Sequence, residues 1–308
     1  MQRKRAILNV VYHVFVVAFG LLMIYPVLWM ILSSFKLKSE ILGNKAPFLP
    51  SVWVFENYPN GWQGSGSLTF ATYFRNSIIV SCLGTLGTVI SSAMVAYTLA
   101  RVNFKGRKFW FTAMIMTMLL PGQVLMIPQY IIWNRLGLVG TFVPLILPKY
   151  LGWPFFIYMM MQFIRGLPKE LDEAAMIDGC NKYSIFSRII LPLLGPSIIT
   201  TIVISFYWIW DDYMGPLLYL SKPALYTVSL AIKGFADAQG TNFGPMFAMS
   251  SLSLIPVFLL FLFVNRYLMD GPSSGSTIRL KIEYVLQPLI MAASSSSLGR
   301  PRMNCIIM

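Results

Sequence analysis

The sequence has very little charge. Only 11% of its 308 residues are Asp, Glu, Lys or Arg, and 56% are hydrophobic, whereas a soluble domain carries about 25% charged residues. A water-soluble globule of this length could not cover its surface with so few charges, which excludes an ordinary cytosolic enzyme. The high hydrophobicity also excludes a disordered chain. Composition therefore places the chain in a lipid bilayer.

Residues that bind metals are equally scarce. The chain has one histidine, His13, and its three cysteines, Cys82, Cys180 and Cys305, share no short metal-ligand spacing. His13 lies inside an apolar run, where a core or interface residue is the simpler interpretation. No glycine-rich phosphate loop with a following Lys-Ser/Thr pair occurs in the sequence, so we expect that the chain does not hydrolyse ATP. We expect no metal site, no cofactor bound by this chain, and no enzyme activity.

Long apolar runs dominate what the sequence does contain. A membrane-spanning helix needs about 20 mostly apolar residues, and prolines within such a run are tolerated where neighbouring helices satisfy the freed backbone groups. The sequence therefore predicts an all-α membrane protein, with one transmembrane domain over residues 1–271 and an atypical, flexible tail over 272–308. The six predicted transmembrane helices cover residues 6–32, 77–100, 109–134, 141–164, 197–220 and 243–264.

The basic residues predict the orientation. Lys and Arg number 24 against 11 acidic residues, and they gather before the first predicted span and after the second, fourth and sixth. Arg101 belongs to the second of these groups. Cytoplasmic loops carry such an excess, so we attribute the charge to membrane topology and expect no nucleic-acid partner. Both termini are expected in the cytoplasm, in a multi-pass protein of a bacterial inner membrane.

Polar chemistry is concentrated in one loop, residues 165–192. Its acidic residues Glu170, Asp172 and Glu173 follow Pro168, which suits the start of a helix whose dipole favours acids in the first turn. Gly179 would end this helix or allow a close backbone contact. A second short helix is expected at about 183–191, stopped by Pro192. A surface of this kind can lie in a groove of a partner protein.

The spacing in this loop resembles a known signature. Glu173-Ala174-Ala175, then Gly179, then Leu191-Pro192 is similar to the EAA motif of binding-protein-dependent ABC importer permeases. Ala96 to Arg101 and Trp210 to Tyr213 resemble further segments of the maltose-permease-like carbohydrate branch, and Gly215 to Leu230 resembles permeases for alginate or other polyuronides. The bland alternative is a solvated turn that happens to contain Ala-Ala and Gly.

The resemblance implies a fold, partners and roles. It implies the type I permease fold of ABC importers, with the loop as a cytoplasmic coupling helix. It also implies a homologous second permease, a dimer of ATP-binding subunits that holds ATP and Mg, and a periplasmic solute-binding protein. The residues expected to couple to the ATPase are Glu173, Ala174, Ala175, Asp178, Gly179, Leu191 and Pro192.

Charges inside a bilayer are expensive and mark candidate functional residues. Lys149 lies in a predicted span beside aromatic residues, which suit sugar faces, and its charge would favour an acidic sugar. The alternative is that Lys149 extends to the outer headgroups. Asp211 and Asp212 could line a path or join neighbouring helices. The candidate path residues are Lys149, Tyr150, Trp153, Trp210, Asp211, Asp212, Tyr213 and Gln123.

These patterns together predict a permease subunit of an ATP-driven importer of oligosaccharides, including acidic ones such as alginate or oligogalacturonide. An ion-coupled secondary carrier is the alternative. It should show intramembrane ionisable relays and internal repeats, and the sequence has few of the first and no visible second. A membrane scaffold without a path would leave the coupling signature unexplained.

Overall fold

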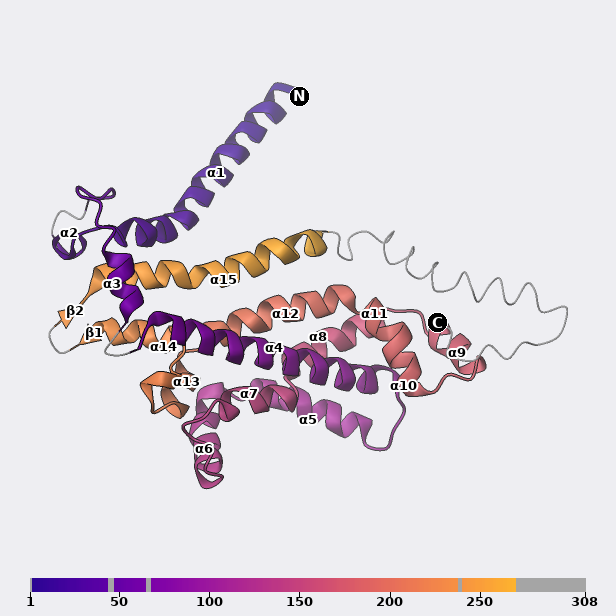
Figure 1. The fold of residues 1–308 in the computed structure, drawn as a ribbon. Coiled ribbons are helices and arrows are strands. Elements are labelled where there is room, and N and C mark those ends of the chain that lie inside the picture. Colours follow the sequence, from indigo (N-terminus) through magenta and orange to yellow (C-terminus); the bar gives the residue numbers. More distant parts are fainter. Residues whose placement is uncertain (1, 44–46, 65–67, 238–239, 270–308) are drawn as a thin grey trace. The chain divides into compact units, whose positions relative to one another are not determined.

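The computed structural model describes residues 2–43, 47–64, 68–237 and 240–269 (Figure 1). These residues are almost entirely helical, as predicted. The described part has one strand pair, β1 (Ala236–Asp237) and β2 (Gly240–Thr241), which run antiparallel with Ala236 opposite Thr241. The predicted tail, 272–308, lies outside the described residues.

Three helices are long and apolar enough to cross a membrane. They are α1 (Gln2–Ser33), α4 (Phe70–Arg101) and α15 (Phe243–Met269). Two bent pairs also qualify, namely α5 (Arg107–Leu119) with α6 (Gly122–Arg135), and Lys182–Leu193 with α12 (Gly195–Trp210). The described residues therefore contain three such helices, or up to five if each bent pair is one span. The predicted number of six stays a prediction.

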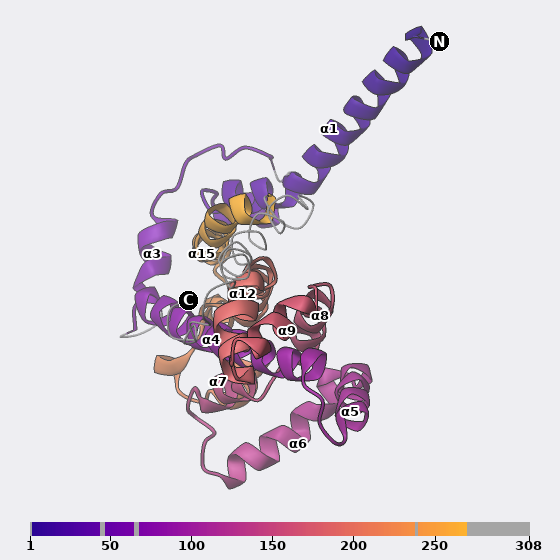
Figure 2. The ribbon, with the colours of Figure 1, turned by 90° about the vertical axis from the view of Figure 1, so that its right-hand side faces the viewer.

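Proline explains most of the breaks. The angle between α5 and α6 is 104°, with Pro121 at the junction, and Figure 2 shows α6 turning away from α5. Figure 1 shows that α1 changes direction along its length, and this helix contains Pro26. Both breaks fit the loss of a backbone donor and the clash of the proline ring with the preceding turn.

The fourth and fifth predicted spans differ from the observed helices. The segment 141–164 forms two helices, α7 (Val143–Tyr150) and α8 (Pro154–Arg165). In the segment 197–220, α12 ends at Trp210 and the chain resumes as α13 (Met214–Tyr219). Asp211, Asp212 and Tyr213 therefore lie between two helices and not inside one long helix.

The chain divides into two compact units, and the prediction of a single domain over 1–271 stays a prediction. The first unit comprises residues 1–76 and 226–256. It holds α1, α2 (Lys38–Leu42), α3 (Asn57–Gln63) and α14 (Val228–Ile232). Its loop after α1 is folded, because Asn57 donates to the carbonyls of Ser34 and Lys36.

The second unit comprises residues 77–225 and 257–308 and contains the candidate site. Helix α8 contacts both α5 and α12. A buried core joins α4 and α8 to the helix α9 (Glu170–Ile177) that follows them. The fully or almost fully buried members of this core are Ala93, Ala96, Tyr97, Leu99, Ile157, Met160, Met161, Ile164, Leu167, Leu171, Ala175, Ile185, Ile190, Leu193 and Leu194.

Candidate functional site

Helix α9 is the centre of the predicted coupling loop. It buries Leu171 and Ala175, one turn apart, together with Asp172. Glu173 is exposed and Ala174 is half-buried. Its first turn carries three acids, as the sequence predicted, where the positive end of the helix dipole stabilises them. One face of α9 is therefore anchored in the core, and the opposite face is presented to solvent.

The end of α9 is fixed by Gly179. This residue has φ +84°, the left-handed region that glycine adopts without cost. The Gly179 N–H donates to the carbonyl of Met176 at 3.1 Å, and the Cys180 N–H donates to that of Ala175 at 2.9 Å. This is the Schellman pattern of helix ends, so the prediction that Gly179 ends the helix is confirmed. A side chain at this position would meet nothing within 4 Å, so the requirement for glycine comes from the backbone alone.

A second helical segment returns the chain to the membrane-spanning helices. It consists of α10 (Lys182–Ile185), a π-helical turn (Phe186–Ile190) and α11 (Leu191–Leu193). Asn181 caps it, accepting a hydrogen bond from the backbone N–H of Ser184 at 2.8 Å. Pro192 lies within α11, and the chain turns by 73° into α12 after Leu193. The predicted second helix is present, but it continues past Pro192.

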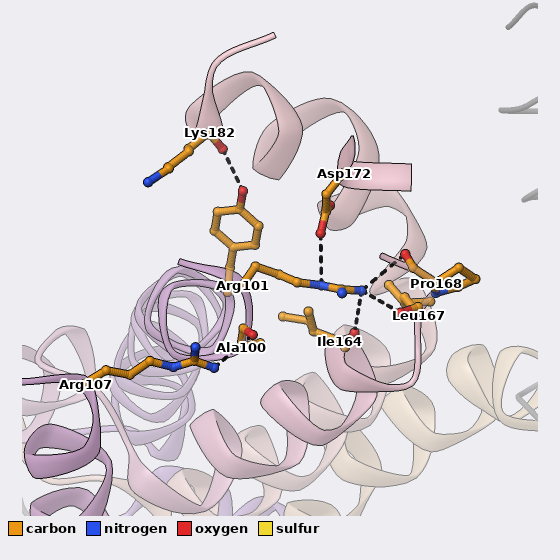
Figure 3. A network of polar contacts seen from close by, with 9 residues as sticks. Ala100, Arg101, Arg107, Ile164, Leu167, Pro168, Asp172 and Lys182 are labelled. Carbon is orange, nitrogen blue, oxygen red and sulfur yellow. Dashed lines mark hydrogen bonds and ion pairs between the residues drawn. The ribbon is translucent and has the colours of Figure 1, made fainter. Parts of the chain in front are cut away.

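Arg101, the last residue of α4, binds the start of the predicted coupling loop (Figure 3). Its Nη2 donates to the carbonyls of Ile164 at 3.0 Å, Leu167 at 2.6 Å and Pro168 at 3.4 Å. Its Nε lies 3.1 Å from Oδ2 of Asp172, and the two side chains are only 6% and 12% exposed. A buried ion pair of this kind requires further hydrogen bonds to offset the loss of hydration. The three carbonyls supply them for Arg101, whereas Oδ1 of Asp172 is buried without a hydrogen-bond partner among the described residues.

Two neighbours of Arg101 have different partners. The hydroxyl of Tyr97 donates to the carbonyl of Lys182 at 3.1 Å, at the start of α10. Arg107 instead bonds locally, to the carbonyls of Leu99 at 2.8 Å and Ala100 at 3.0 Å. Arg107 therefore caps the C-terminal end of α4, whereas Tyr97 and Arg101 hold the coupling loop.

The pKa of the Asp172 carboxyl is subject to opposing effects. Burial raises its pKa above the usual range, the Arg101 guanidinium acts in the opposite direction, and Glu173 adds a further upward contribution. Burial is the largest of these causes, as expected for a charge removed from water. The ion pair therefore stays formed only while this carboxyl is ionised, and it takes up a proton more readily than an exposed aspartate does.

The path candidates Lys149 and Trp153 lie together. The Lys149 Nζ is 3.9 Å from the centre of the Trp153 ring, a cation–π contact. Trp153 in turn contacts Trp208, with ring centres 5.4 Å apart, and Asp212 acts on Lys149 through its charge. Within the described residues, Lys149 thus turns towards an aromatic ring and an acid of its own chain, which does not favour the headgroup alternative.

Close packing positions these residues against α4. A Cβ on Gly87 would clash with the ring of Tyr150, and one on Gly84 would come within 2.9 Å of Ile209. The hydroxyl of Ser91 donates to the carbonyl of Lys149 at 3.0 Å. The small residues of the second predicted span therefore allow the close helix approach that membrane proteins use.

The remaining path candidates have other surroundings. Trp210 is buried and stacks on Phe206 with ring centres 5.8 Å apart. Asp212 accepts a hydrogen bond from the backbone N–H of Gly215 at 3.0 Å, at the start of α13, so it has a structural role as well. Asp211 is exposed, Tyr213 is half-buried, and Gln123 is exposed on α6. Lys149, Trp153 and Asp212 are thus the candidates that lie close together.

The candidate site has two parts in the second unit. One is the predicted coupling loop, residues 165–192, and the other is the Lys149 cluster, which consists of Lys149, Trp153 and Asp212. No group of three or more His, Cys, Asp or Glu residues within the described ranges could hold a metal ion. From the sequence, Arg101 is only one member of a basic group, and Tyr97 has no predicted site role. Residue type and spacing carried no signal for either, because their partners lie 63 to 85 positions away along the chain.

Sequence comparison shows clear relatives. A profile of the family described as binding-protein-dependent transport system inner membrane component matches residues 89–270. A probable ABC transporter permease protein of Bacillus subtilis, YurM, is 36% identical over 85% of this chain and 86% of its own length. The arabinooligosaccharides transport system permease protein AraQ of Halalkalibacterium halodurans is 32% identical over 82% of this chain and 90% of its own length.

A solved structure shares the fold. A chain from the crystal structure of a bacterial ABC transporter involved in the import of the acidic polysaccharide alginate superposes with a TM-score of 0.74. The two are 21% identical, and the match covers 86% of this chain and 98% of the other. At this identity the likeness shows the fold, and it confirms the predicted all-α permease architecture.

Proposed function

This chain belongs to the family of binding-protein-dependent transport system inner membrane components, and from that premise we propose that it forms one half of the path of an ATP-driven oligosaccharide importer. It is a multi-pass membrane component of a transport system and not an enzyme. A secondary carrier would need neither a coupling loop nor a binding protein, so the family assignment leaves that alternative without support.

The exposed surface of the coupling loop is the observation that carries the proposal. Ile177 is 86% exposed, Tyr183 73% and Met176 51%, and the exposed acids Glu173 and Asp178 lie beside them in sequence. Large apolar residues rimmed by charge mark a surface that a partner covers. The partner is the ATP-binding subunit, which carries ATP and Mg. Glu173, Ala174, Ala175, Asp178 and Gly179 form or support the contact surface, and Leu191 and Pro192 connect it to α12.

The assembly follows from this role. One such chain encloses half of a path, so a second, homologous permease completes it, and two ATP-binding subunits dock on the two coupling loops. A periplasmic solute-binding protein delivers the sugar at the opposite side. Because the basic residues flank the coupling loop, both termini face the cytoplasm of a bacterium. ATP binding closes the two ATPase subunits, the coupling loops move with them, and the path changes its open side. Such coupling requires that each ligand bind one conformation better than the other.

Sugars are the proposed substrate class. Several relatives carry oligosaccharide names, such as the arabinooligosaccharide permease. The ring cluster of Trp153, Phe155 and Trp208 beside Lys149 offers the mixture of aromatic faces and donors that sugars need. The preference for acidic sugars depends on Lys149 alone, and Asp212 offsets part of that charge.

Stimulation of ATP hydrolysis tests both the importer function and the preference for acidic sugars. The complete complex, reconstituted with its binding protein, would be assayed with uronate oligosaccharides and with neutral maltose-type ones. We expect stimulation by a loaded binding protein. If the substrate is acidic, Lys149→Ala removes the response to uronates, whereas Lys222→Ala, which changes an exposed lysine, leaves it intact.

Each outcome has one meaning. Stimulation by neutral sugars, unaffected by Lys149→Ala, would keep the importer and reject the acidic substrate. ATP hydrolysis that ignores every loaded binding protein, in a complex that assembles and hydrolyses ATP, would reject the importer itself.

A further inference from the structure

The last turn of α4 contacts the coupling loop on both sides of α9. Tyr97 and Arg101 are four residues apart, so they lie on the same face of the helix. Arg101 holds the start of the loop through Leu167, Pro168 and Asp172, and Tyr97 contacts the carbonyl of Lys182, which follows α9. Figure 3 shows the contacts of Arg101 on one side and the carbonyl of Lys182 on the other.

The guanidinium of Arg101 is suited to holding several groups of the coupling loop in a fixed arrangement. A guanidinium is planar and presents several donors in a fixed geometry, and it is always charged. Here it bonds three carbonyls and one carboxylate at once, and its side chain is 6% exposed. A lysine could keep the charge but could not reach these acceptors together, because its donors radiate from a single nitrogen.

The contact of Tyr97 is independent of that of Arg101. Its ring packs against Phe186 with centres 5.2 Å apart, and only its hydroxyl reaches Lys182. The contacted carbonyl belongs to α10, beyond the turn that Gly179 makes. Movement of α9 and α10 together relative to α4 would therefore have to break contacts at two separate places.

We propose that Tyr97 and Arg101 form a two-point bracket that makes α4 move with the coupling loop. They act as positioning residues, and the inference rests on the proposed coupling to an ATPase. The bracket gives the loop a connection to α4 that does not pass through the short turns flanking α9.

The opposite part of α4 shows where this movement would go. Gly84, Gly87 and Ser91 place α4 in close contact with the segment that carries Lys149 and Tyr150. A continuous series of packed contacts thus runs from the coupling loop through α4 to the Lys149 cluster, all within one compact unit. Packed elements with discrete arrangements are what carry energetic coupling between distant sites.

The test separates coupling from simple stability. The reconstituted complex would be assayed for ATP hydrolysis with and without loaded binding protein and for sugar uptake per ATP. We expect Arg101→Lys to lower the ratio of stimulated to basal hydrolysis about tenfold, as the loss of hydrogen bonds from a charged group implies. Tyr97→Phe removes one oxygen, and we expect a fall of about threefold, as for a neutral hydrogen bond. Uptake per ATP should fall with the ratio.

Arg107→Lys is the matched control. It makes the same chemical change at the start of α5, where the arginine donates hydrogen bonds to residues within eight positions of it in the chain. We expect an unchanged ratio of stimulated to basal hydrolysis. If Arg101→Lys and Tyr97→Phe keep the wild-type ratio, the bracket is rejected, even if thermal stability falls. If Arg101→Lys fails to assemble, Tyr97→Phe decides alone. If the wild-type complex itself shows no stimulation, the failure lies in the proposed function and removes the basis for the bracket.

Discussion

Two cations in the same unit, Arg101 and Lys149, hold their surroundings in different ways. Arg101 bonds three carbonyls and one carboxylate at the coupling end. Lys149 rests on the Trp153 ring near Asp212, and within the described residues no hydrogen bond from its ammonium to the protein is present. The first cation is held by four contacts to its own chain. In the proposed importer, the ammonium of the second is the group that would donate hydrogen bonds to the sugar.

In the proposed importer, Arg101 would transmit movement and Lys149 would recognise the sugar. A residue that transmits movement must be bound on every side, because any loose contact absorbs the displacement. A residue that meets successive substrates must keep donors that can be exchanged. The choice of arginine for the first task and lysine for the second follows from their donor geometry. Changes at the two ends should therefore have different consequences.

The largest expected effect is that of Arg101→Ala on stability. It leaves Asp172 buried without its cation and three carbonyls without their donor, and breaking such a pair costs about 3 to 5 kcal/mol. Thermal unfolding of the purified complex in detergent measures the loss. Arg107→Ala, which removes bonds to carbonyls at a helix end, should cost about 1 kcal/mol. Equal losses of stability in the two variants would show that Arg101 contributes no more to the fold than Arg107, which only caps α4.

A smaller effect is expected at the other end of α4, from Gly87→Val. The added side chain meets the ring of Tyr150, and overpacking of this kind costs about 1 to 3 kcal/mol. The double variant Gly87→Val, Tyr150→Ala should recover part of the loss, because the opposing ring is gone. Unfolding temperatures of the three variants measure this. No recovery in the double variant would show that Gly87 acts through something other than this contact.

The smallest effect concerns pH at Asp172. Burial raises its pKa, Glu173 raises it further, and the Arg101 guanidinium lowers it. The charge of Asp172 in turn acts on the neighbouring Tyr97 phenol. For a carboxyl whose pKa rises on folding, the contribution to stability is present at low pH and is lost as the pH rises through that pKa. Acidification thus favours the fold through this group while it removes the ion pair that completes the bracket.

Stability and coupling should therefore change in opposite directions. The ratio of stimulated to basal hydrolysis should fall modestly as the pH is lowered, relative to the same ratio in Asp172→Asn, which cannot titrate. Parallel pH profiles in wild type and variant would show that the charge on Asp172 does not contribute to coupling.

The sequence predicted the parts of the site that depend on local pattern. The charge-poor composition predicted a membrane protein, and the spacing from Glu173 to Pro192 predicted the family. The helix ending at Gly179 followed from the positive φ that glycine alone adopts freely. Each of these depends on neighbours in sequence or on one residue type.

The sequence could not predict contacts made across the fold. Arg101 looked like one more cytoplasmic charge, because nothing near it in sequence identifies Asp172 or the Leu167 carbonyl as its partners. The fifth predicted span was extended through Asp211 because the hydrophobicity resumes after Tyr213, although the helix ends at Trp210. The number of spans stays open for the same reason, since apolar runs do not show where a helix bends.

The uninterrupted course of α4 has a mechanical consequence. Of the three long helices in the described part, α1 and α15 contain a proline and α4 does not. At 1.5 Å per residue, the distance from Arg101 to Gly84 is about 25 Å. A straight rod of this length works as a lever, so a tilt of about 5° imposed at Arg101 would displace Gly84 by about 2 Å. Gly84 packs against Ile209 and the side chain of Lys149, so a displacement of this size would act directly on the residues that surround Lys149.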